Sequence, residues 1–129
     1  MTSPVRLLLF TQTLDGETCV QTRQILDELP LLSGKIAVDE ANLVLDADKA
    51  KQYGVDRVPS IAVLGHAADG ADRDSRIRFV GTPAGYEFIS LVHAVLLVGG
   101  GESTLTEESR RRIAAVAKPV VMQVFTTPT

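Results

Sequence analysis

The sequence contains a single cysteine, Cys19, among its 129 residues. One cysteine excludes a disulfide within the chain, and this favours a cytoplasmic location over a secreted, disulfide-stabilised one. Basic residues are not in excess either, because 13 lysines and arginines stand against 16 acidic residues, for a formal net charge of −3. A chain with this charge is not expected to bind nucleic acid or an anionic membrane surface.

Long apolar runs are also missing. The longest one, residues 91–98, is interrupted by His93 and is too short to span a bilayer. The first ten residues, MTSPVRLLLF, lead directly into a predicted strand and lack the cleavage region of a signal peptide. We therefore expect no membrane partner and no secretory leader.

Hydrophobic residues make up 45% of the chain and charged residues 22%, which suits one soluble globular domain at this length. Short apolar and β-branched runs predict four strands, at residues 5–11, 35–41, 60–64 and 76–80. Apolar residues at helical spacing predict four helices, at residues 17–29, 47–53, 84–98 and 107–117.

The predicted helix ends rest on capping residues. Asp15 is placed to cap the first helix, Thr82 with Pro83 the third, and Thr104 with Glu107 the last. Pro30 and Gly54 lie just beyond the first and second helices. The buried face of the first helix is predicted to hold Val20, Thr22, Ile25, Leu26 and Leu29.

The helix predicted at 84–98 is apolar around most of its circumference. Its polar residues Glu87, Ser90 and His93 form one narrow stripe. A helix that packs on one sheet needs an apolar face of only about a third of its circumference. We therefore expect a further element to cover this helix.

A short repeat links the two ends of the chain. Residues 4–13, PVRLLLFTQT, align with residues 119–128, PVVMQVFTTP, with identical Pro, Val, Phe and Thr at four positions. The first copy is followed by a turn and a helix. The second copy is predicted to be a buried strand that opens a second unit of the same kind, so that residues 1–100 form one domain and residues 101–129 a linker helix and the first strand of an incomplete second unit.

The element order βαβαββα resembles that of the thioredoxin and glutaredoxin folds, an α/β class with a central mixed sheet flanked by helices. The stretch from Lys35 to Ile61, which ends in KAKQYGVDRVPSI, resembles the second strand, second helix and cis-proline loop of glutaredoxin-like protein disulfide oxidoreductases, which contain two thioredoxin-fold units in tandem. The stretch IRFVGTPAGYEFISLVHAVLLVGG, residues 77–100, is similar to the same proteins and to the N-terminal domain of the alkyl hydroperoxide reductase flavoprotein subunit. In such proteins, a strand like residues 119–127 runs into the CxxC motif of the second unit.

The resemblance places the redox motif of the first unit at the turn before the first helix, where this sequence has GETC. Gly16 then takes the nucleophile position and Cys19 the resolving position. Thiol–disulfide exchange needs an exposed thiolate at the first position. We therefore predict that Cys19 is a small core residue, and that the unit is inactive by itself.

The resemblance also implies a cis peptide bond at Val58-Pro59 and pairing of the backbone before Pro59 with an extended substrate. A structural turn retained without activity is the interpretation that we favour, and docking of a peptide or thiol substrate there is the alternative. His66 and His93 have no second ligand at metal spacing, and the aspartates of the loop at 69–74 lack the pattern of a calcium loop. Arg110, Arg111 and Arg112 predict a solvated, internally paired helix face. No cofactor or metal is expected.

Three classes of function remain. The first, which we favour, is a non-catalytic unit of a thiol–disulfide oxidoreductase that supports a following CxxC unit in disulfide exchange, peroxide-reductase electron transfer or redox homeostasis. The second is a standalone redox protein that uses Cys19, and the third is an interaction domain without a redox role. The expected partner is a second thioredoxin-like unit or another copy of the chain in a homodimer, while thiol or disulfide proteins are further candidates.

Overall fold

The computed structural model describes residues 1–13 and 16–127. Four strands, β1 (Val5–Thr11), β2 (Ile36–Asn42), β3 (Ser60–His66) and β4 (Asp72–Val80), form one sheet in the order β2-β1-β3-β4. β1 is parallel to β2 and antiparallel to β3, which in turn is antiparallel to β4. The βαβ start and the later hairpin were predicted from the sequence, and the mixed α/β fold class is confirmed.

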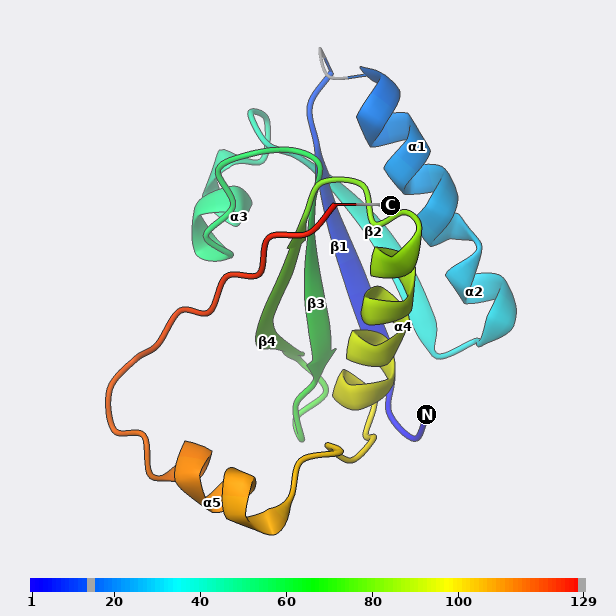
Figure 1. The fold of residues 1–129 in the computed structure, drawn as a ribbon. Helices are drawn as coiled ribbons and strands as arrows, with labels where there is room; N and C mark the ends of the chain where they lie inside the picture. The colour runs from blue at the N-terminus through cyan, green and yellow to red at the C-terminus, as the bar shows by residue number, and fades with distance from the viewer. Residues whose placement is uncertain (14–15, 128–129) are drawn as a thin grey trace.

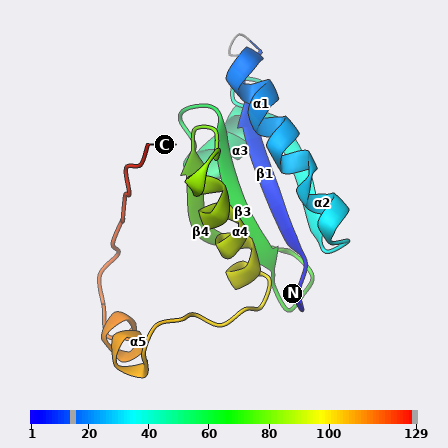
Figure 2. The ribbon, with the colours of Figure 1, turned by 45° about the vertical axis from the view of Figure 1, so that its right-hand side comes forward.

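Helices cover both faces of this sheet. α1 (Gly16–Asp27), α2 (Leu29–Leu32) and α4 (Tyr86–Val98) lie on one face, and α3 (Ala47–Gln52) lies on the other (Figures 1 and 2). α5 (Glu107–Ala114) stands apart from the sheet in both views. The sheet and the first four helices therefore form the body of the chain.

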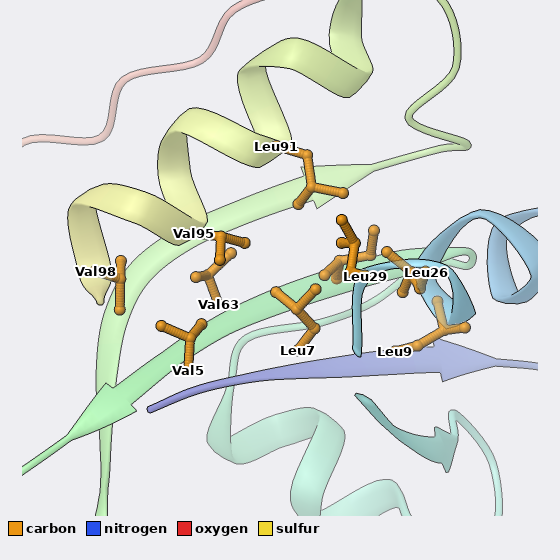
Figure 3. Packing of buried hydrophobic residues seen from close by; sticks show 10 residues of the cluster. Val5, Leu7, Leu9, Leu26, Leu29, Val63, Leu91, Val95 and Val98 are labelled. Atoms are coloured by element: carbon orange, nitrogen blue, oxygen red, sulfur yellow. The ribbon is translucent and has the colours of Figure 1, made fainter. Parts of the chain in front are cut away.

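The core divides between the two faces because side chains alternate along β1. Val5, Leu7 and Leu9 point toward α1 and α4, where they meet Leu91 and Val95 among other buried residues (Figure 3). Leu8 and Phe10 point the other way and pack with Ala50 of α3 and with residues of β3. Burial of each large apolar side chain stabilises the fold by about 1.5–3 kcal/mol.

The helix ends differ from the predicted ones in several places. The predicted cap of the first helix, Asp15, lies outside the described residues. α1 ends at Asp27, and Pro30 falls inside the short helix α2 because proline is tolerated in a first helical turn. Val20 is exposed, so its prediction as a buried residue was wrong, whereas Thr22, Leu26 and Leu29 are buried.

Thr82 and Thr104 do not cap helices. α4 begins later than predicted, after Gly85, whose φ of 62° and ψ of −134° suit glycine. α5 is capped by Thr106, which accepts a hydrogen bond from the Ser109 amide, and it ends three residues earlier than predicted. The strands β3 and β4 extend beyond their predicted ends because they pair with each other along the hairpin.

Residues 119–127 form no strand, and this prediction was wrong for the chain as described. The segment is extended and exposed throughout, including Val120, Val121, Met122, Val124 and Phe125. A strand requires a neighbour to accept its backbone hydrogen bonds, and none of the four described strands pairs with this segment. Its apolar residues are therefore left in contact with solvent.

Candidate functional site

Three segments meet at the end of the sheet where β1 finishes and α1 starts. They are the first turns of α1, the loop that contains Val58 and Pro59, and the residues Gly81 and Thr82 that follow β4. Ser60 brings the last two together because it pairs with Phe10 of β1 on one side and with Val80 of β4 on the other. The predicted site residues Gly16, Cys19, Val58 and Pro59 thus belong to neighbouring segments.

Hydrogen bonds join these segments into one site. The Gly81 amide donates to the Pro59 carbonyl at 2.8 Å. The Thr22 hydroxyl donates to the Thr18 carbonyl at 2.7 Å and lies 2.9 Å from the Thr82 hydroxyl. Because a hydroxyl has only one proton to donate, the Thr82 hydroxyl must donate to that of Thr22. The loop after β4 is therefore hydrogen-bonded to both of the other segments.

Gly16 stands at the exposed end of α1. A Cβ atom built at Gly16 would meet no heavy atom within 4 Å, so a larger side chain fits there without displacing a neighbour. Cys19, three residues later, is buried, with 5% of its surface exposed. The position that faces solvent thus lacks a thiol, and the thiol that is present is covered.

Val58 is half-buried and Pro59 is buried, and the peptide bond between them is cis. The side chain of Ser60, which follows, donates to the Arg57 carbonyl at 2.6 Å and closes the loop. This loop packs against the α3 side of the sheet, where Val58 contacts the cluster of Phe10.

The sequence reasoning missed Thr22, Gly81 and Thr82 as parts of this site. Thr22 was assigned to a buried helix face and Thr82 to a helix cap. The glycine at position 81 was a signal in the sequence that the chain turns there. Its φ of 97° is a conformation that favours glycine. The pairing of Thr22 with Thr82 spans 60 residues of sequence and could not have been inferred from local patterns.

Charged side chains also gather on the α3 side of the sheet. Arg6 forms ion pairs with Asp39 at 3.1 Å and with Asp72 at 3.2 Å. Arg78 contacts both carboxylate oxygens of Asp74, at 2.7 and 2.9 Å, and stacks over the Tyr53 ring. Hydrogen bonding from Arg78 lowers the pKa of Asp74 below its ordinary value, and burial opposes this shift.

The remaining candidates form no metal site. Among residues 1–13 and 16–127, no group of three or more His, Cys, Asp or Glu side chains could hold a metal ion. Asp72 and Asp74 are engaged by arginines, and His66 and His93 are exposed. Within the same residues, α5 forms no ion pair, so the predicted internal pairing of its arginines was wrong. Arg110 donates to the Ser103 carbonyl instead.

Among the described residues, every helix is too short or too polar to span a membrane.

No protein-family model matches the sequence, and no curated protein matches it. Solved structures do match. The NTD_N/C domain of the alkylhydroperoxide reductase AhpF from Enterococcus faecalis is 30% identical, with a TM-score of 0.79, over 92% of this chain and 55% of that one. The fold is thioredoxin-like.

A protein disulfide oxidoreductase from Aeropyrum pernix is 26% identical, with a TM-score of 0.74, over 89% of this chain and 48% of that one. A thioredoxin from Halobacterium salinarum, at 20% identity and a TM-score of 0.59 over 78% of this chain and 80% of that one, shares the fold. The predicted resemblance to a protein disulfide oxidoreductase and to an alkylhydroperoxide reductase is thereby confirmed. This chain spans about half the length of the first and second of these proteins.

Proposed function

We propose that this chain is a non-catalytic thioredoxin-fold unit of a thiol–disulfide oxidoreductase. The observation that carries the proposal is the pair of positions at the start of α1, where Gly16 is exposed and Cys19 is buried. Disulfide exchange begins when a thiolate attacks a disulfide sulfur, and the attacking group must be accessible. Gly16 has no such group, and a one-cysteine mechanism would need the same position.

The unit would instead act as a scaffold and docking surface for a CxxC unit. The matched proteins support this role because their chains are about twice as long as the region that this chain covers. Residues 101–129 would form the linker helix and the first strand of that second unit. The CxxC unit would carry disulfide exchange or electron transfer to a peroxide reductase, in the cytoplasm, as part of redox homeostasis.

The loop at Val58 and Pro59 would retain the docking surface for a thiol or disulfide protein. The two hydrogen bonds that tie Gly81 and Thr82 to the neighbouring segments support this, because they keep the loop in place without a catalytic thiol. A substrate held there would be presented to the partner unit.

Without a second unit, we propose that two copies associate through residues 119–129 and α4. The exposed apolar residues of both segments support this, since exposed apolar surface favours association with another chain. Sedimentation over a range of protein concentrations is expected to show a dimer at high concentration.

An activity assay tests the proposed function. The chain is expected to reduce insulin, or a glutathione mixed disulfide, no faster than its Cys19→Ser variant. Gly16→Cys is expected to form an intramolecular disulfide with Cys19 under mild oxidant, because the CxxC spacing at the start of a helix suits the geometry of a disulfide. Gly34→Cys is the matched control, since Gly34 also has open space around it and lies away from the site.

Three outcomes would contradict this proposal. Turnover by the unsubstituted chain that is lost in Cys19→Ser would instead support the standalone single-cysteine protein. Rapid titration of Cys19 in the native chain would point the same way, because a thiol at 5% exposure should react slowly. Failure of Gly16→Cys to form the disulfide would show that the two positions do not correspond to a CxxC pair, which would favour a non-redox interaction domain.

A further inference from the structure

Three consecutive glycines, residues 99–101, follow α4 and are here called the glycine joint. Glycine-rich stretches behave as flexible links when nothing holds them. In this chain the Gly99 amide donates to the Val95 carbonyl and the Gly101 amide to the Leu96 carbonyl, both at 2.9 Å. Gly100, between them, has a φ of 104°, a conformation that favours glycine and that commonly ends a helix. The joint is therefore hydrogen-bonded to the last turns of α4.

The first three residues of the chain contact this joint and are here called the strap. They lie beside the end of α4 in both views (Figures 1 and 2). The amides of Thr2 and Ser3 both donate to the Gly99 carbonyl, at 3.1 and 3.0 Å. The Thr2 carbonyl in turn accepts from the Lys35 side chain at 3.0 Å. Carbonyls at the C-terminal end of a helix lack partners within the helix, so the strap supplies the missing donors.

The strap also leaves no room for side chains on the joint. A Cβ atom built at Gly100 would collide with the Thr2 hydroxyl, and one built at Gly99 would lie 2.9 Å from the Met1 side chain. At Gly70, whose φ of 85° is similar, a Cβ atom would meet nothing within 4 Å. The close approach of the strap thus accounts for glycine at two positions of the joint.

Both sides of this contact are anchored in the body of the chain. The strap continues through Pro4, whose ring fixes φ, into β1, where the Val5 amide donates to the Lys35 carbonyl at 2.8 Å. Val98, the last residue of α4, is buried in the same core cluster as Val5. Because β1 and α4 are already packed together, only a few residues lose conformational freedom when the strap binds the joint.

We infer that the strap is a conformational lock on the glycine joint. While residues 1–3 are bound, the joint is fixed and the chain can first change direction after Gly101. When they are displaced, the Gly99 carbonyl loses two donors and the same glycines become a hinge, because glycine has more backbone freedom than any other residue. In a two-unit protein the strap would thus set the direction in which the second unit is attached, and this consequence alone rests on the proposed function.

Disulfide trapping in the 129-residue chain tests whether the strap is bound. A Cβ atom built at Gly100 lies 3.6 Å from the Thr2 Cβ, and disulfides join Cβ atoms about 3.5–4.5 Å apart. In a Cys19→Ala background, Thr2→Cys with Gly100→Cys is therefore expected to form an intramolecular disulfide under mild oxidant, seen by mass spectrometry.

The matched control pairs Thr2→Cys with Gly70→Cys, because both glycines have a positive φ. The control is expected to react on the order of tenfold more slowly, since its Cβ atoms lie too far apart for a disulfide. Equal rates for the two pairs, or a disulfide that forms only between two chains, would overturn the inference.

Amide hydrogen exchange, followed by NMR, tests the lock without a cysteine or glycine substitution. The amides of Ser3 and Gly101 are expected to be protected in the unsubstituted chain. Thr2→Pro removes the amide donor at position 2 and is expected to speed the exchange of both amides about threefold to tenfold, the effect of one lost hydrogen bond. Thr2→Val keeps that donor and is expected to leave both rates close to those of the unsubstituted chain.

Two results of the exchange experiment would overturn the inference. One is exchange of Ser3 and Gly101 at the rate of an unfolded peptide in the unsubstituted chain, and the other is equal rates in Thr2→Pro and Thr2→Val. Neither experiment measures thiol chemistry. Failure of the lock is therefore distinguishable from failure of the proposed function, which the activity assay decides.

Discussion

Residues 4–11 and residues 119–126 have nearly the same pattern, PVRLLLFT and PVVMQVFT, but lie in opposite environments. Val5 and Phe10 are 2% and 0% exposed, whereas the corresponding Val120 and Phe125 are 67% and 90% exposed. β1 pairs with β2 and β3 and is covered by helices on both faces. The later segment has no such neighbours among the described elements. A strand-forming sequence therefore becomes a strand only where other elements accept its hydrogen bonds and cover its side chains.

The strongest test of this comparison replaces the two phenylalanines. Phe10→Ala is expected to lower the free energy of unfolding by about 3–5 kcal/mol, because it opens a cavity in a packed core. Phe125→Ala is expected to change it by no more than about 0.5 kcal/mol, as for other exposed sites. Urea unfolding, at a concentration that keeps the chain monomeric, measures both. Equal losses would show that residues 119–127 are buried in solution.

A smaller effect is expected from the ion pairs of the sheet, of which α5 has none within the described residues. The pKa of Asp74 is lowered by Arg78, so this carboxylate stabilises the folded chain above its unfolded pKa of about 3.9. That contribution is lost as the pH falls through the lower pKa of the folded state. Asp74→Asn is expected to cost about 0.5–1 kcal/mol at pH 7, after allowance for solvent screening.

The cost of Asp74→Asn should shrink as the pH is lowered from about 5 toward 2, because the native carboxylate is then protonated as well. Unfolding curves of the two chains across this range measure it. Asp69→Asn is the control, since Asp69 accepts only from the Ala71 amide at the hairpin turn. A difference that stays constant with pH would contradict a role for the charge of Asp74.

The smallest change in folding stability is expected from removal of residues 119–129. Because residues 119–127 are exposed, the monomer should lose no more than about 0.5 kcal/mol. Self-association should nevertheless weaken, which sedimentation would detect as a shift toward monomer. A chain that is monomeric at high concentration both before and after the deletion would contradict the proposed homodimer. A large loss of stability would show that the segment packs against the body of its own chain.

Local patterns predicted the four strands of the sheet and the four main helices, because alternation and helical spacing reflect which side chains must leave water. The family resemblance, which places Cys19 at the second position of the CxxC motif, predicted that Cys19 would be buried. Helix ends were less predictable. Thr82 and Thr104 have the residue type of a cap, but Gly85 and Thr106 precede the helices, since the path of the preceding loop decides where a helix begins.

The residues available to the site follow from the sequence: one cysteine at the fourth position of GETC, a glycine at the first, and a proline after Val58. Which segments meet at the site depends on how the sheet and helices pack. The Thr22–Thr82 contact and the Gly81–Pro59 hydrogen bond join residues far apart in the chain, so no local pattern encodes them. The packing also gives two similar segments different environments: residues 5–11 form a central strand, and residues 119–127 are exposed. The reason is that burial depends on neighbouring elements, and the sequence of a segment does not specify its neighbours.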